Sequence, residues 1–426
     1  MLFRSPSTCL VSIFAAQLLF ALALVVQLAR VATGKARWPR LPVDGPILAF
    51  SVWSLLSASF SSDPVDSHES AKKLVLFLLL YLAVEVMAEA SARERVMDAA
   101  LLGGLVLAGG ALLQYHLLGF DTIDHRPHSF LGHYMTASGL SMGVLIVSAA
   151  RLAFTRPALP QRGDLAKAFL LLLGLGAVAG ASAGGLFAIE IERLFVAALA
   201  VAAFMLAAGG GSWPTPGART LLASLAFAAS AWALLVSRTR NAWIGAVLGL
   251  TVVAVLRAPK LLLALAAGIA AVAIVRPAPV MDRLNLDASS VDRYYMWQAG
   301  LDMIRDKPVF GLGPGRILAA YPAYRWPEAP NALTPHMHNN VVQIAAERGL
   351  PCLVWWIWLV AALLADAWRA LRRSGDWGAH AALALLVAIL AAGMFEYNFG
   401  DSEVLMFVLV VAALPYALRP RALAGA

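Results

Sequence analysis

The sequence is poor in charged residues and in cysteine, and it has no repeat or heptad pattern. Only 14% of its 426 residues are charged, whereas 61% are hydrophobic; soluble proteins average about 25% charged residues. An ordinary soluble domain is therefore excluded. The two cysteines, Cys9 and Cys352, fall in or beside apolar runs. We interpret them as buried apolar side chains and not as a disulfide or a metal-binding pair.

Long apolar runs dominate what is present and predict an all-α, polytopic membrane protein. Several approach the roughly 20 residues that a helix needs to cross a bilayer. The first is too long for a signal-peptide core and lacks a cleavage site, so we expect it to be a retained span. We expect about twelve spans from thirteen candidates, because thirteen would leave the N-terminus outside. The candidates are residues 9–31, 41–59, 74–87, 97–118, 134–152, 168–189, 194–208, 221–236, 243–256, 261–275, 350–365, 379–394 and 404–418.

The net charge of +8 reflects membrane orientation and does not indicate nucleic-acid binding. Basic clusters at 35–40, 151–167, 257–260, 369–373 and 419–421 lie between apolar runs. By the positive-inside rule they mark the cytoplasmic side. Connections 60–71, 120–133, 237–241, 276–348 and 395–403 are then expected outside. The chain divides into N-terminal spans (1–275), a large periplasmic loop (276–348) and C-terminal spans (349–426).

The large loop is predicted to form an ordered cap over the membrane surface. Residues 289–305 show helical periodicity, with apolar side chains recurring near one face. Asp287 or Ser289 is expected to cap this helix. The sequence Gly311-Leu312-Gly313-Pro314-Gly315 then breaks regular structure.

Apolar packing does not explain the polar segment His336-Met337-His338-Asn339-Asn340, which lies just before an apolar run. A chemical role does explain it, because an imidazole at a membrane–water boundary can accept a proton from a hydroxyl near neutral pH. A satisfied structural histidine is the simpler alternative at either position.

Three motifs, in order along the chain, resemble signatures of the O-antigen ligase and polymerase superfamily. The sequence departs from these signatures at Asn241 and Cys352, where the family has glycine. The resemblance therefore does not predict the geometry of the turn after Arg240. The motif residues are Ser237, Arg240, Trp243 and Gly245; Arg293, Trp297, Pro308, Gly311, Gly313 and Gly315; and His338, Asn339, Gln343, Glu347, Gly349 and Pro351.

This resemblance implies a GT-C-type glycosyltransferase in the bacterial inner membrane with its active site facing the periplasm. Its donor would be a glycan on undecaprenyl diphosphate, and its acceptor in the ligase branch is a lipid A–core oligosaccharide hydroxyl. Besides these substrates it would contact membrane lipids and no nucleic acid. The family's histidine and arginines carry over to His338, Arg240 and Arg293.

Fixed cations suit this chemistry, because a departing diphosphate needs charge stabilisation and arginine binds phosphate bidentately. Arg240 at a span end and Arg293 on the loop helix are the main candidates, and Arg238, Arg316 and Lys72, next to Lys73, are weaker ones. The alternative for each is contact with lipid headgroups or solvent.

His338 is the expected general base, with His336 and Asn339 as neighbouring substrate contacts. Glu347, nine residues later, is too far along a helix to pair with it and is expected to serve the helix instead. A second polar cluster contains His125, Arg126, His128 and His133, whose spacing matches no standard zinc pattern. Asp-x-Asp pairs are missing from the outer loops; Asp401, Glu403 and Glu396 come nearest. We therefore predict no metal and no cofactor.

Three alternatives stay open. An O-antigen polymerase or a protein O-oligosaccharyltransferase of the same superfamily would share the donor. The ligase is favoured by the two preserved motifs and by the expectation that no soluble domain follows the last span. A lipid-linked glycan transporter is disfavoured, because its ionisable candidates Glu85, Glu190 and Glu192 lie at span ends.

Overall fold

The computed structural model describes residues 7–164, 215–283 and 288–417, and every regular element in them is a helix. The expected all-α class is therefore confirmed for this part of the chain. Two expected spans, 168–189 and 194–208, and the expected cap residue Asp287 lie outside it. The elements are α1 (Ser7–Ala32), α2 (Asp44–Ser59), α3 (Pro64–Ala71), η1 (Lys72–Phe77), α4 (Leu78–Val86), α5 (Ala90–Leu117), α6 (Tyr134–Phe154), α9 (Pro216–Val236), α10 (Arg240–Arg257), α11 (Leu261–Val275), α12 (Ala278–Met281), α13 (Ala288–Asp306), α14 (Ile317–Tyr324), α15 (Asn340–Ser374), α16 (Trp377–Ala392), η2 (Asn398–Gly400), α17 (Ser402–Ala412) and α18 (Leu414–Ala417).

Five helices of the described residues are long and apolar enough to cross a membrane, namely α5, α6, α9, α10 and α15. Shorter apolar helices cover Phe20–Ala32, Leu261–Val275, Trp377–Ala392 and Ser402–Ala417. A multi-span membrane protein follows from this. The total of about twelve spans stays a prediction.

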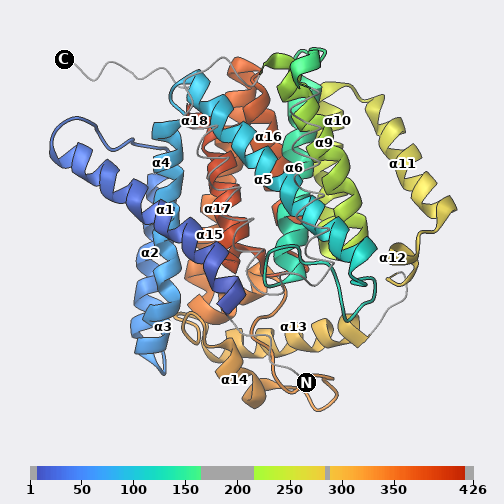
Figure 1. The fold of residues 1–426 in the computed structure, drawn as a ribbon. Coiled ribbons are helices and arrows are strands. Elements are labelled where there is room, and N and C mark those ends of the chain that lie inside the picture. Colours follow the sequence, from blue (N-terminus) through green and yellow to red (C-terminus); the bar gives the residue numbers. More distant parts are fainter. Residues whose placement is uncertain (1–6, 165–214, 284–287, 418–426) are drawn as a thin grey trace.

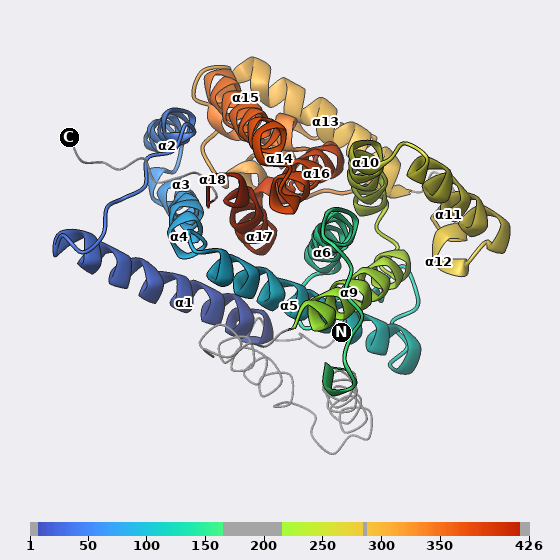
Figure 2. The same ribbon diagram turned by 90° about the horizontal axis from the view of Figure 1, so that it is seen from above.

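The long helices form a bundle, and α13 and α14 lie across one of its ends (Figure 1). Seen along the bundle, α6, α10, α16 and α17 occupy its middle (Figure 2). Helices α10 and α15 both begin at the end that α13 covers. Their basic C-terminal residues, Arg257 and Arg372 with Arg373, therefore lie at the opposite end, in agreement with the sorting of loops by charge.

Small residues bring the central helices together. A Cβ added to Gly245 of α10 would lie 2.4 Å from Sδ of Met142 on α6 and 2.7 Å from the Ala388 carbonyl on α16. Gly249, one turn later, is similarly enclosed by Ile146 and Ala388. Such close backbone approach is how helices gain van der Waals contact in a membrane.

Helix α15 begins ten residues before the expected span at 350–365 and bends at Gly349. Gly349 has φ 80° and ψ 167°, and a Cβ there would lie 1.9 Å from the Val309 carbonyl oxygen. Its neighbour Leu350 donates its N–H to the Pro308 carbonyl. The last residues that the sequence assigned to the large loop, 340–348, are therefore helical. They form the part of α15 before the bend, and the apolar run follows the bend.

The large loop forms the ordered cap that the sequence predicted. The expected helix at 289–305 is present as α13, and glycines 311, 313 and 315 have left-handed φ values of 67°, 105° and 77°. The cap has a hydrophobic core of its own, formed by Met296, Ala299, Met303, Ile317, Tyr321, Met337 and Ala346.

Candidate active site

The short segment before α15 is fixed by its neighbours. Met337 is fully buried; its N–H donates to Oε1 of Gln343 (2.6 Å), and its carbonyl accepts from Nε1 of Trp297 on α13 (2.9 Å). The next residue, His338, has a left-handed backbone with φ 47°, which is uncommon for a residue with a side chain. The cap helix and the first turn of α15 therefore set the position of His338.

Two asparagines attach the start of α15 to the connection between α16 and α17. Oδ1 of Asn339 caps α15 by accepting from the backbone N–H groups two and three residues later (2.8 and 3.1 Å). Its Nδ2 donates to the Met394 carbonyl (2.9 Å), and the N–H of Asn340 donates to the Gly393 carbonyl (2.8 Å). Asn339, expected to contact substrate, is thus occupied as a helix cap and bridge.

This attachment brings Glu396 against both histidines. Nδ1 of His338 lies 2.8 Å from Oε2 of Glu396, a hydrogen bond. Nδ1 of His336 lies 3.6 Å from Oε1 of the same carboxylate, too far for one. The two imidazole centroids are 4.1 Å apart. Glu396 itself is 7% exposed.

The electrostatics of this group favour an ionised Glu396 beside a neutral His336. Burial acts to raise the pKa of Glu396, but its hydrogen bond with His338 and the nearby imidazoles outweigh burial and lower that pKa. Burial lowers the pKa of His336 to about 4, against the attraction of Glu396. Because an ionised carboxylate only accepts hydrogen bonds, His338 must carry its proton on Nδ1. Its Nε2 is then the acceptor in the neutral ring.

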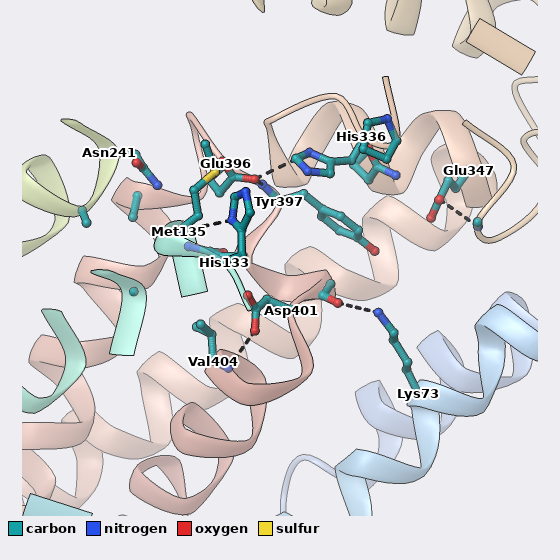
Figure 3. Close-up of a pocket in the computed structure, with 18 of the residues that line it drawn as sticks. Lys73, His133, Met135, Asn241, His336, Glu347, Glu396, Tyr397, Asp401 and Val404 are labelled. Atoms are coloured by element: carbon teal, nitrogen blue, oxygen red, sulfur yellow. Dashed lines mark hydrogen bonds and ion pairs between the residues drawn. The ribbon is translucent and has the colours of Figure 1, made fainter. Parts of the chain in front are cut away.

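A cavity of about 330 Å³ lies next to these residues. His336, Glu396 and Tyr397 form part of its wall, and His133 and Lys73 reach it from other elements (Figure 3). His338 does not itself line the cavity; it is hydrogen-bonded to Oε2 of Glu396, which does. The cavity has room for a sugar-sized group.

Glu347 has a structural role, as expected. Its Oε1 accepts from the Gly315 N–H (2.8 Å), and its Oε2 pairs with Arg348 (2.6 Å). Its carbonyl also accepts from the N–H of Gly313 (2.8 Å). Glu347 therefore holds the glycine-rich turn of the cap to α15 and does not pair with His338.

Arg240 and Arg293 lie at the same end of the bundle as His338. Arg240 is the first residue of α10, and its Nη2 lies 2.9 Å from Oγ of Ser290 on α13. Ser290 and Arg293 are three residues apart on that helix and so share a face. The charge of Arg293 contributes to lowering the pKa of His336. Arg240 thus contacts the helix that carries Arg293, and Arg293 is close enough to His336 to act on its charge, although neither arginine lines the cavity.

The three weaker cationic candidates each have an acidic partner, whereas Lys73 reaches the cavity. Its Nζ donates to the Gly400 carbonyl (2.8 Å) (Figure 3). The pairs are Arg238 with Asp282 (2.9 Å), Arg316 with Asp63 (3.3 Å) and Asp66 (2.8 Å), and Lys72 with Glu69 (2.8 Å).

Of the second polar cluster, His133 alone belongs to the cavity wall. It caps α6, with Nδ1 accepting from the Met135 N–H (3.2 Å). Burial lowers its pKa, opposed by Glu396 and Asp401. Arg126 instead lies over the ring of Tyr134, 4.3 Å from its centroid.

Within the described residues, one set of side chains combines the chemistry and spacing of metal ligands. It consists of His336, His338 and Glu396, whose candidate ligand atoms all lie within 4.8 Å of one another. The sequence argument did not group these residues, because 58 positions separate His338 from Glu396.

Sequence reasoning also missed the polar wall formed by Tyr397, Asn398 and Asp401. Glu396 and Asp401 were noticed only as the nearest approach to a metal-binding acidic pair. The available signal was a run of polar residues between two apolar helices on the side already assigned to the site.

Comparison with known proteins gives one family. Residues 225–357 match the family model described as O-antigen ligase, a segment that contains Arg240, Arg293 and His338. No curated protein matches the chain significantly.

Proposed function

Because residues 225–357 of this chain match the family model described as O-antigen ligase, we propose that the protein is an inverting glycosyltransferase. It moves an O-antigen glycan from undecaprenyl diphosphate to a hydroxyl of the lipid A–core oligosaccharide, at the periplasmic face of the inner membrane. The observation that carries this proposal is the hydrogen bond from His338 to Glu396, a carboxylate in the wall of a cavity of about 330 Å³.

The pair supplies the base. Nε2 of His338 accepts the proton of the acceptor hydroxyl as its oxygen attacks the anomeric carbon from the face opposite the diphosphate. The new C–O bond forms, the bond to the phosphate oxygen breaks, and the configuration inverts. Glu396 acts through His338, because it keeps the proton on Nδ1 and stabilises the imidazolium that forms.

Arg240 and Arg293 supply the positive charge for the leaving group. A polyprenyl diphosphate lies at headgroup depth, where the first residue of α10 and the cap helix meet. Guanidinium groups placed there stabilise the negative charge that develops on the leaving oxygen. Lys73, on another side of the cavity, is a third cation within the site.

The polymerase and the protein O-oligosaccharyltransferase differ from this proposal only in the acceptor. A transporter differs in needing no base. In the direct test, purified protein in detergent is incubated with lipid-linked glycan and one acceptor at a time. The acceptors are lipid A–core, a second lipid-linked glycan and an acceptor protein. Extension of lipid A–core supports the ligase, whereas extension of another acceptor reassigns the branch. Absence of any transfer, together with glycan movement across vesicles, would leave a transporter.

His338→Ala tests the base assignment in the same assay, and His125→Ala is its matched control. His125 is exposed on the 120–133 connection and does not line the cavity. We expect transfer to fall by about 10²–10⁴-fold in His338→Ala and to be unchanged in His125→Ala. Normal transfer by His338→Ala would remove His338 from the mechanism.

A further inference from the structure

We propose that His336, His338 and Glu396 form a binding site for a divalent transition metal such as Zn²⁺, and that its occupation switches off transfer. The binding half of this proposal stands on the geometry alone. The inhibitory half rests on the proposed function, since it requires His338 to be the base.

The spacing of the ligand atoms fits a small tetrahedral ion. Bonds of about 2.1 Å at tetrahedral angles place two ligand atoms about 3.4 Å apart. In the structure, Glu396 oxygens lie 3.6 Å from Nδ1 of His336 and 2.8 Å from Nδ1 of His338. Side-chain shifts of less than about 1 Å would bring both contacts to the metal-bound spacing. All three candidate ligand atoms lie within 4.8 Å of one another, so the two imidazole nitrogens must also come together when the ion binds. Two imidazoles and one carboxylate leave the fourth position to water, as in open zinc sites.

A second observation points to an absent ligand. Nδ1 of His336 is buried and has no hydrogen-bond partner, although it faces a carboxylate oxygen 3.6 Å away (Figure 3). Buried polar atoms are normally satisfied. A metal ion between Nδ1 and Oε1 would give Nδ1 a partner, while Oε1 also accepts from the Tyr397 N–H. The positive charges of Arg293 and, when protonated, His133 oppose the cation, so the negative charge of Glu396 is required for binding.

Occupation would reverse the hydrogen-bonding character of the base. In the free site the proton of His338 is on Nδ1, and Nε2 accepts. A metal on Nδ1 displaces that proton to solvent, and the neutral ring takes one proton from solvent on Nε2. Nε2 then donates and cannot deprotonate a hydroxyl. The net proton count of the imidazole is unchanged, yet the base is lost.

Binding is measured first, without reference to activity. Full-length protein in detergent is stripped with EDTA, dialysed, and titrated with Co²⁺, whose visible absorption reports tetrahedral nitrogen and oxygen ligands. We expect one Co²⁺ per chain, displaced by Zn²⁺. The band should be lost in His336→Ala and retained in the control His125→Ala. Absence of the band in the unmodified protein, or its persistence in His336→Ala, would overturn the site.

Inhibition is measured second, as the Zn²⁺ concentration that halves transfer, each variant being compared with its own activity in EDTA. We expect His336→Ala to need at least about tenfold more Zn²⁺, because even outer-shell changes weaken metal sites by 10–100-fold. Co²⁺ binding without inhibition would overturn the switch and leave the site. Metal binding by a protein whose His338→Ala variant transfers normally would overturn the proposed base and, with it, the switch. Thermal unfolding in the same detergent verifies that each variant is folded.

Discussion

Replacement of Glu396 by Gln is the sharpest test of how the base is organised. The substitution keeps the shape of the side chain and its carbonyl-type acceptor for the Tyr397 N–H, which now bonds Oε1 at 3.0 Å. It removes the negative charge that accepts from Nδ1 of His338 at 2.8 Å. A glutamine NH₂ group facing Nδ1 would instead donate, and would drive the imidazole proton to Nε2.

The size of the effect follows from these two losses. A hydrogen bond to a charged group is worth about 1.5–3 kcal/mol, which alone corresponds to roughly 10–150-fold in rate. Reversal of the tautomer removes general-base catalysis, worth about 10²–10⁴-fold. We therefore expect kcat for Glu396→Gln to fall by about 10²–10⁴-fold with little change in KM for the lipid-linked donor.

The assay is single-acceptor glycan transfer by purified protein, with Glu328→Gln as the control. Glu328 is an exposed carboxylate of the cap. The double variant Glu396→Gln/His338→Ala should be no slower than His338→Ala, because residues that act as a unit are not additive. A Glu396→Gln enzyme with unchanged kcat, or a double variant slower by the product of the single effects, would refute the pairing as the source of catalysis.

Other predictions concern the charge at the site and the backbone that supports it. Arg293→Ala should lower transfer by about 10²–10³-fold, the typical cost of losing one fixed transition-state donor, and Arg293→Lys should lower it less; Arg305→Ala, on the exposed face of the same helix, should have no effect in the same assay. Gly349→Ala should destabilise by more than about 3 kcal/mol, because the left-handed backbone and the clash with a carbonyl add, whereas Gly375→Ala, at φ 60° with open space around it, should cost about 1 kcal/mol; thermal unfolding in detergent decides. Asn339→Ala should lower stability by about 1–2 kcal/mol through loss of the cap, and Asn339→Ser should restore part of it; equal unfolding temperatures would contradict the capping role. Transfer should survive excess EDTA at full rate, and a loss reversed by added metal would show that catalysis needs one.

The local features of the fold were predictable because they depend on neighbouring residues. Periodicity predicted the N-terminal end of the cap helix to within one residue. The run from Gly311 to Gly315 predicted a break in regular structure, and its three glycines have positive φ values, which favour glycine. For α15 the sequence predicted only the apolar part, as a span at 350–365. Hydropathy detects where the apolar face begins, whereas this helix starts with nine less apolar residues before the bend at Gly349.

The cationic candidates show a different limit. Lys72 and Lys73 are adjacent in the 3₁₀ helix η1, in which successive residues point about 120° apart. One of them therefore pairs with Glu69 on the surface, and the other reaches Gly400 at the cavity. Composition treats the two as equivalent, and only the register of the packed helix separates them. Arg238 was the weaker candidate beside Arg240, and its burial against Asp282 commits it to a structural pair.

The partner of His338 could not be read from the sequence, because it depends on how three connections meet. Glu396, Asp401 and Glu403 are all acidic and all close to the predicted outer surface, so the histidine had no unique mate. The choice is made by the side chains of two asparagines that hold the connection carrying Glu396. Nδ2 of Asn339 donates to the Met394 carbonyl. Nδ2 of Asn340 donates to Oδ1 of Asn398, and its Oδ1 accepts from the Phe399 N–H. Asn340→Ala should therefore slow transfer by displacing Glu396, and not through a contact of Asn340 with the substrate. Its effect should vanish in an enzyme that already lacks the Glu396 carboxylate. Additive losses in the Asn340→Ala/Glu396→Gln enzyme would mean that the asparagine supports something other than the base.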